Sequence, residues 1–324
     1  MARGLQKIQS QKKNQEKQQS KKGPSDNKKT AEMSSNNTSI QPENPGLAPF
    51  NYQCRGTDIL LPNNIHAYFV STSSLAPACM GIVIVHDVFG FKINKTRRYA
   101  DILAAKANAN VLMPDFFQGG DPWPLNDFPA KDQENFSSWL KKVGNWNYIT
   151  QVLSTSNDYL KTLLSEEHRN SLGILGFSWG GKQVMRACSS KCYGYVAGVS
   201  IDGYMLEAED AEKLNIPVFF MPSGDNKSID TIKSILKKRP FGDRCRYFTF
   251  GDESHGFASA LGDLNNQNTL EAVNHTITLS SAFFIENARD AEKAGKEKSE
   301  HSISKKTASS KEILSSGLNI ARSS

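Results

Sequence analysis

Short apolar runs alternate with amphipathic stretches through the middle of the chain. The run CMGIVIVHD at 79–87 is apolar and rich in β-branched residues, which is typical of a strand buried on both faces of a parallel sheet. A Phe-Gly turn follows it, and 96–108 then shows helical periodicity. The same alternation predicts further strands at 109–115, 171–176, 194–202, 216–223 and 244–250, and helices within 130–164 and at 179–188, 208–214, 231–239 and 267–288.

The order of these elements, with short connections between them, defines the fold class. It predicts right-handed strand–helix–strand units and a mostly parallel sheet covered by helices on both faces. No internal repeat interrupts the alternation. We therefore predict one α/β domain over about 46–289, with polar tails at 1–45 and 290–324.

The two ends differ from this domain in composition and charge. Residues 1–45 are rich in Lys, Gln, Ser and Asn and carry nine Lys/Arg against four Asp/Glu. Such a segment buries too little apolar surface to offset its ordering entropy, which predicts disorder or a helix that frays over 4–20. Residues 290–324 are similar, and a short docking helix at 313–320 is the alternative to a disordered polar tail there. Between the tails, 23 basic and 24 acidic residues nearly cancel, so the net charge of +6 belongs to the ends, mainly the first.

The cysteines and the N-terminal residues bear on the cellular compartment. Five cysteines are an odd number, and they are scattered along the chain. The first residues lack the apolar core of a signal peptide, and no apolar run reaches the length of a membrane span. These features predict reduced thiols in a cytoplasmic protein, with nuclear access open to it. Cys188 and Cys192 are four residues apart, but two thiols alone make a poor zinc site, so we predict no metal and no cofactor.

A single serine stands among glycines in GFSWGG at 176–181. Ser178 follows an expected strand and precedes an expected helix, which places it at the carboxyl edge of the sheet, where α/β proteins place their chemistry. In a G-x-S-x-G turn the serine backbone is strained, so Gly176 and Gly180 must lack side chains that would clash. The N-terminus of the following helix favours developing negative charge. Ser178 is thus a candidate nucleophile, and a tight packing turn is the alternative.

A serine nucleophile needs a base, and His255 is the histidine best placed to supply it. On sheets that carry this turn, the chain order is serine, acid, histidine. His255 lies in GDESHGF, a loop after the strand expected at 244–250. The other histidines precede the serine or lie in polar helical or tail segments (His66, His86, His168, His275 and His301). An ordinary exposed loop histidine is the alternative interpretation.

The acid that orients the base should also stand at a strand end, between Ser178 and His255. Asp225 in PSGDN follows one expected strand and precedes His255 by one strand–helix step. Asp202 ends the strand before that and is the rival. Asp225 is better placed, because its strand comes later and leads directly to the histidine.

Backbone N–H groups are expected to stabilise negative charge on a substrate oxygen. One donor should be the N–H of Trp179, the residue after the serine. The other should come from the loop after the strand that ends near His86, and Val88 is the residue predicted there.

Taken in order, these motifs resemble the dienelactone hydrolase (carboxymethylenebutenolidase-like) family of α/β-hydrolases. The matching stretches span about 80–260, and PDFFQGGDPW is similar to the eukaryotic cytosolic branch. They are VIVHDVFGF at 83–91, VLMPDFFQG at 111–119, GFSWGG at 176–181, PSGD at 222–225 and SHGF at 254–257.

The resemblance implies an α/β-hydrolase domain that cleaves a lactone or activated ester through a covalent acyl-enzyme. The nucleophile, acid and base of the family correspond to Ser178, Asp225 and His255 in this chain. Asp87 occupies the place of an acidic residue that, in the family, contacts the nucleophile in the resting enzyme.

Two departures from the family pattern bear on the substrate. The family's usual nucleophile is cysteine, and a hydroxyl group must lose its proton during attack, whereas a thiolate is already poised. Relatives that cleave anionic dienelactones hold the substrate carboxylate with arginines, one of them shortly after the histidine, and HGFASALGD has none. An uncharged or bulkier ester is therefore expected, near Trp179, Phe89, Phe116 and Trp123, although these aromatic residues are equally compatible with core positions.

The N-terminal residues carry a second resemblance. The stretch MARGLQKIQSQKKN is similar to the basic opening of the small EDRK-rich factor family over about thirty residues. Its charge suits a weakly bound anionic partner, such as RNA or a membrane surface, through a screened electrostatic attraction. It lacks aromatic residues for base stacking, and a solvated flexible tail is the alternative.

Together these features predict a hydrolase that acts on a small-molecule ester or lactone. A thioesterase or peptidase is one alternative, because acyl-transfer machinery alone does not select the leaving group. The other is a binding protein whose hydrolase chemistry has lapsed and whose basic tail contacts nucleic acid or acidic proteins. The complete set of Ser178, Asp225 and His255 argues against it. No oligomeric state is predicted.

Overall fold

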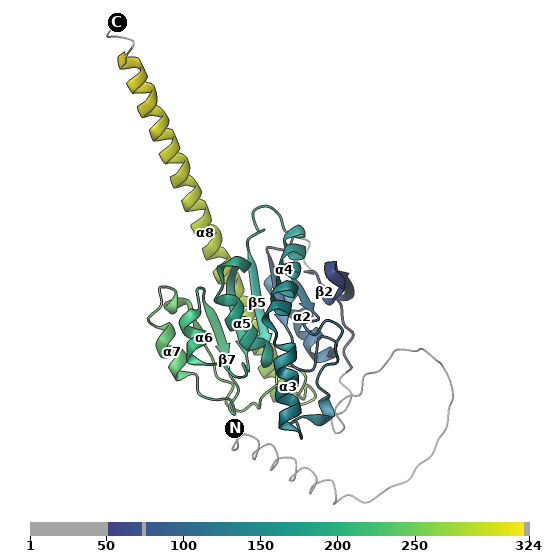
Figure 1. Cartoon of the computed structure of the whole chain (residues 1–324). Helices are drawn as coiled ribbons and strands as arrows, with labels where there is room; N and C mark the ends of the chain where they lie inside the picture. The colour runs from purple at the N-terminus through teal and green to yellow at the C-terminus, as the bar shows by residue number, and fades with distance from the viewer. Residues whose placement is uncertain (1–50, 73–75, 321–324) are drawn as a thin grey trace, which may run out of the picture.

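An eight-stranded sheet forms the centre of the molecule (Figure 1). The computed structural model describes residues 51–72 and 76–320, with side chains up to Gly295. The strands lie in the order β1-β2-β4-β3-β5-β6-β7-β8, and every neighbouring pair from β4 onward is parallel. They are β1 (Thr57–Leu61), β2 (Ile65–Val70), β3 (Met80–Val85), β4 (Ala109–Pro114), β5 (Leu172–Phe177), β6 (Tyr195–Ile201), β7 (Val218–Met221) and β8 (Arg246–Tyr247).

The mostly parallel sheet confirms the predicted α/β class. β3, β4 and β5 are buried at every position, as continuous apolar runs require in a sheet that is covered on both faces. β8 has only two residues, fewer than expected for 244–250, and a single bridge between Ser223 and Phe250 continues its pairing with the chain after β7. The parallel arrangement brings the carboxyl ends of β3, β5, β6 and β7 to one edge of the sheet.

The apolar pattern does not predict the first two strands. β1 and β2 form an antiparallel hairpin, and β2 pairs antiparallel with β4. Asn63 and Asn64 make the turn with φ angles of 62° and 57°, a left-handed region that asparagine tolerates better than most residues. Because β1 lies at the edge and is largely exposed, its residues lack the apolar run that marks the central strands.

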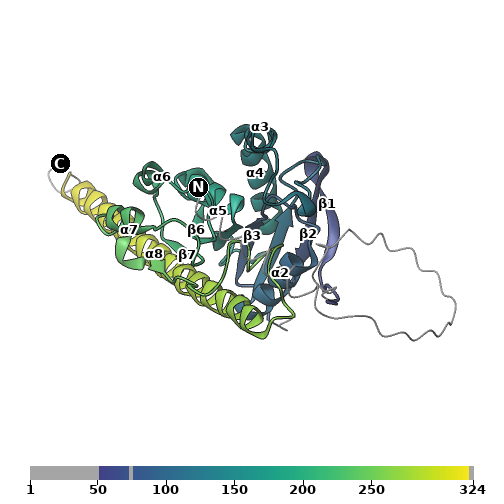
Figure 2. The same ribbon diagram turned by 90° about the horizontal axis from the view of Figure 1, so that it is seen from below.

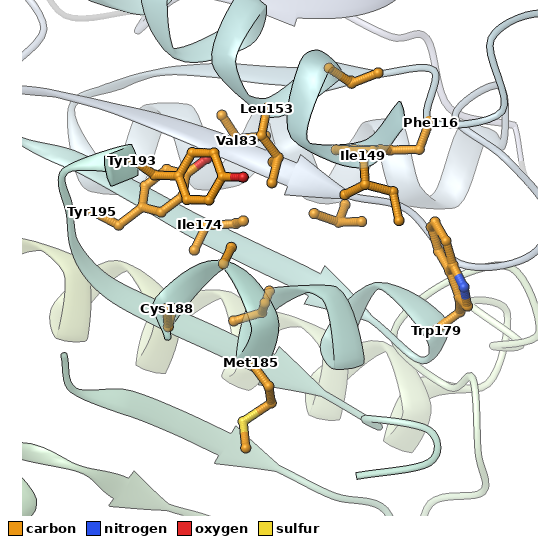
Figure 3. Packing of buried hydrophobic residues seen from close by; sticks show 14 of the residues in the cluster. Val83, Phe116, Ile149, Leu153, Ile174, Trp179, Met185, Cys188, Tyr193 and Tyr195 are labelled. Carbon is orange, nitrogen blue, oxygen red and sulfur yellow. The ribbon is translucent and has the colours of Figure 1, made fainter. Parts of the chain in front are cut away.

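Helices cover both faces of the sheet, as predicted (Figure 2). α2 and α8 pack on one face, where Tyr99 and Phe284 share a buried cluster with the strands. Helices α3 to α7 lie on the other face, and Figure 3 shows Ile149 of α4 and Trp179 of α5 in the cluster there, with Ile174 of β5. The helices are α2 (Asn94–Ala107), α3 (Gln133–Val143), α4 (Trp146–Thr162), α5 (Trp179–Cys188), α6 (Ala208–Lys213), α7 (Asp230–Leu236) and α8 (Gln267–Ile320).

The last helix is longer than the sequence predicts. The pattern predicts a helix that ends at 288 and a polar tail from 290, whereas α8 continues to Ile320. The extension has a physical reason: residues 289–320 contain no proline, and their six Lys and four Glu favour helix. In Figure 1 the helix projects away from the sheet toward the C-terminus.

Contacts of α8 also pass the predicted domain boundary at 289. Glu292 Oε1 accepts a hydrogen bond from Nδ1 of His168 at 2.9 Å and one from Oγ of Ser171 at 3.1 Å. Both partners belong to the connection between α4 and β5, and the side chains of His168 and Glu292 are three-quarters buried. The folded domain therefore reaches at least Glu292.

The sequence also makes predictions about the N-terminal tail, membrane spans and the cysteines. The predicted tail at 1–45, with its fraying helix, lies outside the described residues. Within the described part of the chain, no helix is both long enough and apolar enough to cross a membrane. All five cysteines are free thiols, and burial raises the pKa of Cys188 and Cys245.

We expect Glu292→Ala to lower the free energy of unfolding by about 1 to 2 kcal/mol, because it leaves two partly buried donors without an acceptor. The matched control is Glu286→Ala on the same helix, whose ion pair with Arg246 is solvent-exposed. Its cost should stay within about 0.5 kcal/mol. Urea denaturation measures both values. Equal effects of the two substitutions would show that α8 does not dock through Glu292.

Candidate active site

Ser178 occupies a strained turn between β5 and α5. Its backbone angles are φ 50° and ψ −109°, an unfavourable region for a residue with a side chain. Hydrogen bonds hold the residue from both sides: its N–H donates to Ile201 O at 2.9 Å, and its carbonyl accepts from Tyr204 N at 2.9 Å and Gly181 N at 3.0 Å. The turn is thus fixed to β6 and to the loop after it.

The glycines on either side of Ser178 allow this turn to close. A Cβ atom on Gly176 would lie 2.3 Å from the backbone of Gly180, and one on Gly180 would lie 2.2 Å from the carbonyl oxygen of Val85. Side chains are therefore excluded at both positions, as the G-x-S-x-G pattern predicts. The close approach packs the start of α5 directly against the end of β3.

The hydroxyl of Ser178 meets the imidazole of His255. Ser178 Oγ and His255 Nε2 are 2.8 Å apart, a hydrogen bond between residues 77 positions apart in the chain. Ser178 is 8% exposed and His255 is half-buried. The predicted nucleophile and base are therefore in direct contact, at the distance that proton transfer requires.

Two carboxylates hold the histidine loop. Asp225 Oδ1 accepts from the backbone N–H of His255 at 2.9 Å and from Ser223 Oγ at 2.9 Å. Asp202 is buried, and its two oxygens accept from Ser223 N at 2.8 Å and Gly256 N at 3.0 Å. Burial raises the pKa of Asp202, and the charge of His255 and these hydrogen bonds oppose the shift.

Asp202 and Asp225 differ in whether a carboxylate oxygen remains available to the imidazole of His255. Among the described residues, neither of them hydrogen-bonds the second ring nitrogen of His255, Nδ1, in this structure. Both oxygens of Asp202 already accept backbone N–H groups, whereas Oδ2 of Asp225 accepts no hydrogen bond from a described residue. Asp225 therefore keeps an oxygen available to the imidazole.

Asp87 binds the backbone and not the serine. Its Oδ1 accepts from Phe89 N at 2.9 Å, and its Oδ2 accepts from Ala260 N at 3.3 Å. Burial raises the pKa of Asp87, while hydrogen bonds from Ser259, Phe89 and Ala260 lower it. Asp87 shares no hydrogen bond with Ser178 in the described structure, since both of its oxygens bind these amides, and its role toward the nucleophile stays a prediction. Asp87 instead joins the loop after β3 to the segment that follows His255.

His86 is a structural histidine, which agrees with its exclusion as the base. It is fully buried; Nδ1 donates to Asp87 O at 2.7 Å, and Nε2 accepts from Phe116 N at 3.1 Å. This pairing requires the neutral ring, and burial lowers the pKa of His86 accordingly. His86 ties the end of β3 to the loop after β4.

A cavity of about 330 Å³ opens in front of Ser178 and His255. Its wall is largely apolar and comes from the loop after β3, the segment before α3 and the region around β7 and α7. The apolar and aromatic lining residues are Val88, Phe89, Phe128, Pro129, Ala130, Phe136, Tyr204, Met205, Leu206, Phe220, Met221, Pro222, Ile229, Ile232 and Leu261.

Of the four aromatic residues expected near the substrate, Phe89 lines the cavity, and Trp179, Phe116 and Trp123 do not. Phe116 is 2% exposed, and its ring packs against His86 and Trp179 in the core (Figure 3). Trp123 packs against rings of α3. For Phe116 and Trp123 the core position, given as the alternative, is the one observed, because both side chains turn inward in the segment after β4. The sequence pattern did not single out Phe128, Phe136 or Tyr204, since no motif marks them.

The comparisons with known proteins establish the family of this chain. The family model described as the dienelactone hydrolase family matches residues 65–285, more than half of the chain. The chain belongs to the dienelactone hydrolase family. Residues 1–34 separately match the model for small EDRK-rich factor 1/2-like N-termini, which confirms the resemblance of the opening run; they lie outside the described residues.

Individual relatives of this dienelactone hydrolase family member are distant. A carboxymethylenebutenolidase homolog of Homo sapiens is 31% identical over 199 residues, which are 60% of this chain and 76% of that protein. An uncharacterized AIM2 family protein of Schizosaccharomyces pombe is 25% identical over 254 residues, 75% of this chain and 96% of that protein. A solved structure from Klebsiella pneumoniae, assigned as a dienelactone hydrolase, has a TM-score of 0.57 at 18% identity over 72% of this chain and 99% of that chain, which shows the shared fold.

Two backbone N–H groups of this dienelactone hydrolase family member, those of Val88 and Trp179, are predicted to be oxyanion donors. Trp179 is the first residue of α5, so its N–H has no acceptor within the helix. Val88 lines the cavity beside Ser178. Among the described residues, neither N–H donates a hydrogen bond, so both are free to donate to a substrate oxygen. Their role as oxyanion donors stays a prediction.

The charged groups of the cavity are few. Asp87 and Asp225 accept backbone N–H groups, and Lys227 is exposed. Arginine is absent from the described lining, which agrees with the departure from the family pattern seen in the sequence. The described residues also contain no group of three His, Cys, Asp or Glu side chains that could hold a metal ion.

We expect Gly176→Ala to lower the free energy of unfolding by about 3 kcal/mol or more, because the added methyl group overlaps the backbone of Gly180. Gly251→Ala is the control, since a Cβ there meets nothing within 4 Å. Its effect should be within about 1 kcal/mol of zero. Denaturant unfolding followed by tryptophan fluorescence compares the two, and a Gly176→Ala variant as stable as the control would contradict the close packing at the turn.

Proposed function

We propose that this protein is a serine hydrolase that cleaves an uncharged carboxylic ester or lactone through an acyl-enzyme. The observation that carries the proposal is the 2.8 Å hydrogen bond between Ser178 Oγ and His255 Nε2, made at a strained strand–helix turn. The apolar cavity in front of the pair supports it further, because such a site can hold a small organic substrate away from bulk water.

The proposed reaction begins with attack by Ser178. Nε2 of His255 takes the hydroxyl proton as Oγ bonds to the carbonyl carbon of the substrate. The carbonyl oxygen becomes negatively charged and accepts hydrogen bonds from the N–H groups of Val88 and Trp179. When the carbon–oxygen bond to the leaving group breaks, the imidazolium returns its proton to the departing alkoxide, and the acyl group remains on Oγ.

Hydrolysis of the acyl-enzyme repeats these steps with water as the nucleophile. His255 takes a proton from the water, hydroxide adds to the acyl carbon, and Oγ leaves with the proton that the imidazolium returns. The products are a carboxylic acid and an alcohol. If the substrate is a lactone, both groups stay in one molecule, a hydroxy acid.

We assign Asp225 as the acid partner of His255. Its carboxylate already binds the backbone of the histidine, and Oδ2 is the oxygen available for an imidazole that rotates toward it. Asp202 is the alternative, since its charge also acts on His255. Its two oxygens are occupied by the amides of Ser223 and Gly256, which favours a role in fixing the loop.

The other functional predictions are less favoured. A lapsed hydrolase would have no need for a strained serine that meets a histidine, so the intact pair supports an enzyme. A thioesterase would use the same residues and differs in its leaving group. We also propose a reducing, cytoplasmic setting with nuclear access, which the five free cysteines support. An anionic partner of the basic residues at 1–34 remains a proposal from their charge.

We expect a fluorophosphonate probe to label the wild-type protein at Ser178, because the probe reacts with serine hydroxyls that a neighbouring base activates. Ser178→Ala should abolish labelling, and His255→Ala should lower esterase kcat/KM by about 10³-fold or more. Mass spectrometry of the labelled peptide and assays with lactone, aryl ester and thioester substrates measure this.

The control for labelling is Ser165→Ala, at a serine in the loop after α4 outside the cavity, which should leave the probe signal unchanged. Absence of labelling and of hydrolysis in a folded wild-type protein would refute the proposed function. Hydrolysis of thioesters alone would replace the ester assignment with a thioesterase.

Asparagine substitutions distinguish the two carboxylates. Asp225→Asn should lower kcat/KM by about 10²- to 10⁴-fold with the fold retained, because the imidazole loses the charge that stabilises its protonated form. Asp202→Asn should instead lower the free energy of unfolding by about 1 to 3 kcal/mol, because its one remaining oxygen cannot accept both amide donors. Kinetics and denaturation of both variants measure this. A larger kinetic loss in Asp202→Asn than in Asp225→Asn would reverse the assignment.

A further inference from the structure

Ser200 places a buried hydroxyl group in the wall of the cavity. The residue is 1% exposed and lies on β6. Its Oγ is one of five buried polar side-chain atoms that have no hydrogen-bond partner among the described residues. Of the residues that carry these five atoms, Ser200 lines the cavity. A buried hydroxyl without a partner costs free energy that an alanine at the same position would avoid. The hydroxyl therefore calls for a partner that is not part of this chain.

The surroundings of Ser200 explain why the chain itself offers no partner. The neighbouring residues Val199 and Ile201 pack on the face of α2 and α8, so the Ser200 side chain points to the opposite face, toward α5. On that face the Ser200 hydroxyl lies against two glycines. A Cβ atom added to Gly181 would lie 2.5 Å from Ser200 Oγ, and one added to Gly203 would lie 2.6 Å from it. Neither glycine has a side chain that could bond the hydroxyl, and the N–H of Gly181 already donates to Ser178 O.

Apolar side chains also lie near Ser200. Phe220 is its partner on β7, and Leu206 closes over Gly203 from the loop after β6. Both line the same cavity, together with Ile232 of α7. The wall next to Ser200 is thus apolar, whereas the charged lining residues Asp87, Asp225 and Lys227 belong to the loop after β3 and to the segment between β7 and α7.

Ser200 is also close in the fold to the candidate nucleophile. The residue after it, Ile201, accepts the hydrogen bond from the N–H of Ser178. Ser178, His255 and Ser200 line one cavity. A substrate that reaches Ser178 therefore lies against the wall that contains Ser200.

We propose that Ser200 recognises a second, uncharged polar group of the substrate, such as an ether, carbonyl or hydroxyl oxygen apart from the scissile ester. The inference rests on the proposed hydrolase function and narrows its substrate class to oxygenated esters or lactones. A plain alkyl chain leaves the buried hydroxyl unpaired, whereas an oxygen at the right position completes its hydrogen bond. Sites built around a polar group in this way discriminate strongly against analogues that lack it.

An oxygen scan of the substrate tests this. p-Nitrophenyl hexanoate is compared with analogues in which one methylene of the acyl chain at a time is replaced by an ether oxygen. Each enzymatic rate is divided by the rate of alkaline hydrolysis of the same ester without enzyme, which removes differences in intrinsic reactivity. A second series places methoxy groups on the phenol of aryl hexanoates, in case the alcohol side faces Ser200. In the wild-type protein one position should be preferred over the parent by about 10- to 100-fold in kcat/KM. In Ser200→Ala this ratio should fall to about 1.

Ser156→Ala provides the matched control. Its hydroxyl is equally buried but donates to Val152 O within α4, away from the cavity. This variant should keep the wild-type preference and lose thermal stability, whereas Ser200→Ala should melt at the same or a higher temperature, because it removes an unpaired group.

The possible results separate the two proposals. Hydrolysis by the wild-type protein with no preferred oxygen position, or a preference that survives in Ser200→Ala, would overturn the Ser200 site and leave the hydrolase intact. No hydrolysis of any ester, with no labelling of Ser178, would overturn both. A melting temperature of Ser200→Ala lowered as much as that of Ser156→Ala would show that the Ser200 hydroxyl has a partner within the protein.

Discussion

The backbone conformation of Ser178 is the constraint on which the rest of the site depends. A positive φ of 50° is energetically unfavourable for a residue with a side chain. The turn persists because β6 and the loop after it form hydrogen bonds with both the N–H and the carbonyl of Ser178. Gly176 and Gly180 allow β5, α5 and the end of β3 to approach closely enough to supply this support. The consequence is chemical: Oγ stands at the carboxyl edge of the sheet and at the N-terminus of α5, where negative charge is favoured.

A second constraint acts on the histidine side. β8 offers only two residues of pairing, so the loop after it needs other anchors. Three carboxylates provide them by accepting backbone N–H groups, Asp225 from His255, Asp202 from Gly256 and Asp87 from Ala260. Burial raises the pKa of Asp87 and Asp202, and the hydrogen bonds offset part of that cost. The same negative charges would stabilise an imidazolium at His255, which the proposed mechanism forms in both of its stages.

The features that the sequence predicts are those that local patterns determine. Continuous apolar runs mark β3, β4 and β5 because every position in these strands is buried. The serine turn and the chain order identify Ser178 and His255, which the fold brings to 2.8 Å. Local sequence patterns do not determine the direction in which an aromatic side chain points. Phe116 follows a strand as Ser178 does, yet its N–H donates to His86 and its ring turns into the core. Phe136 lines the cavity only because tertiary contacts place α3 beside it.

The charges around the cavity support the proposal of an uncharged substrate independently of the comparison with the family. In the proposed mechanism the serine hydroxyl becomes charged only during attack, so the negative oxygen and the imidazolium appear together. A largely apolar wall strengthens their attraction. An anionic substrate would bring its charge beside the carboxylates that hold the loop of His255. The described lining contains no arginine to neutralise it, and Lys227 is exposed to solvent, where its charge is screened. An uncharged oxygen atom avoids this repulsion and can still meet the buried hydroxyl of Ser200, which has no hydrogen-bond partner among the described residues.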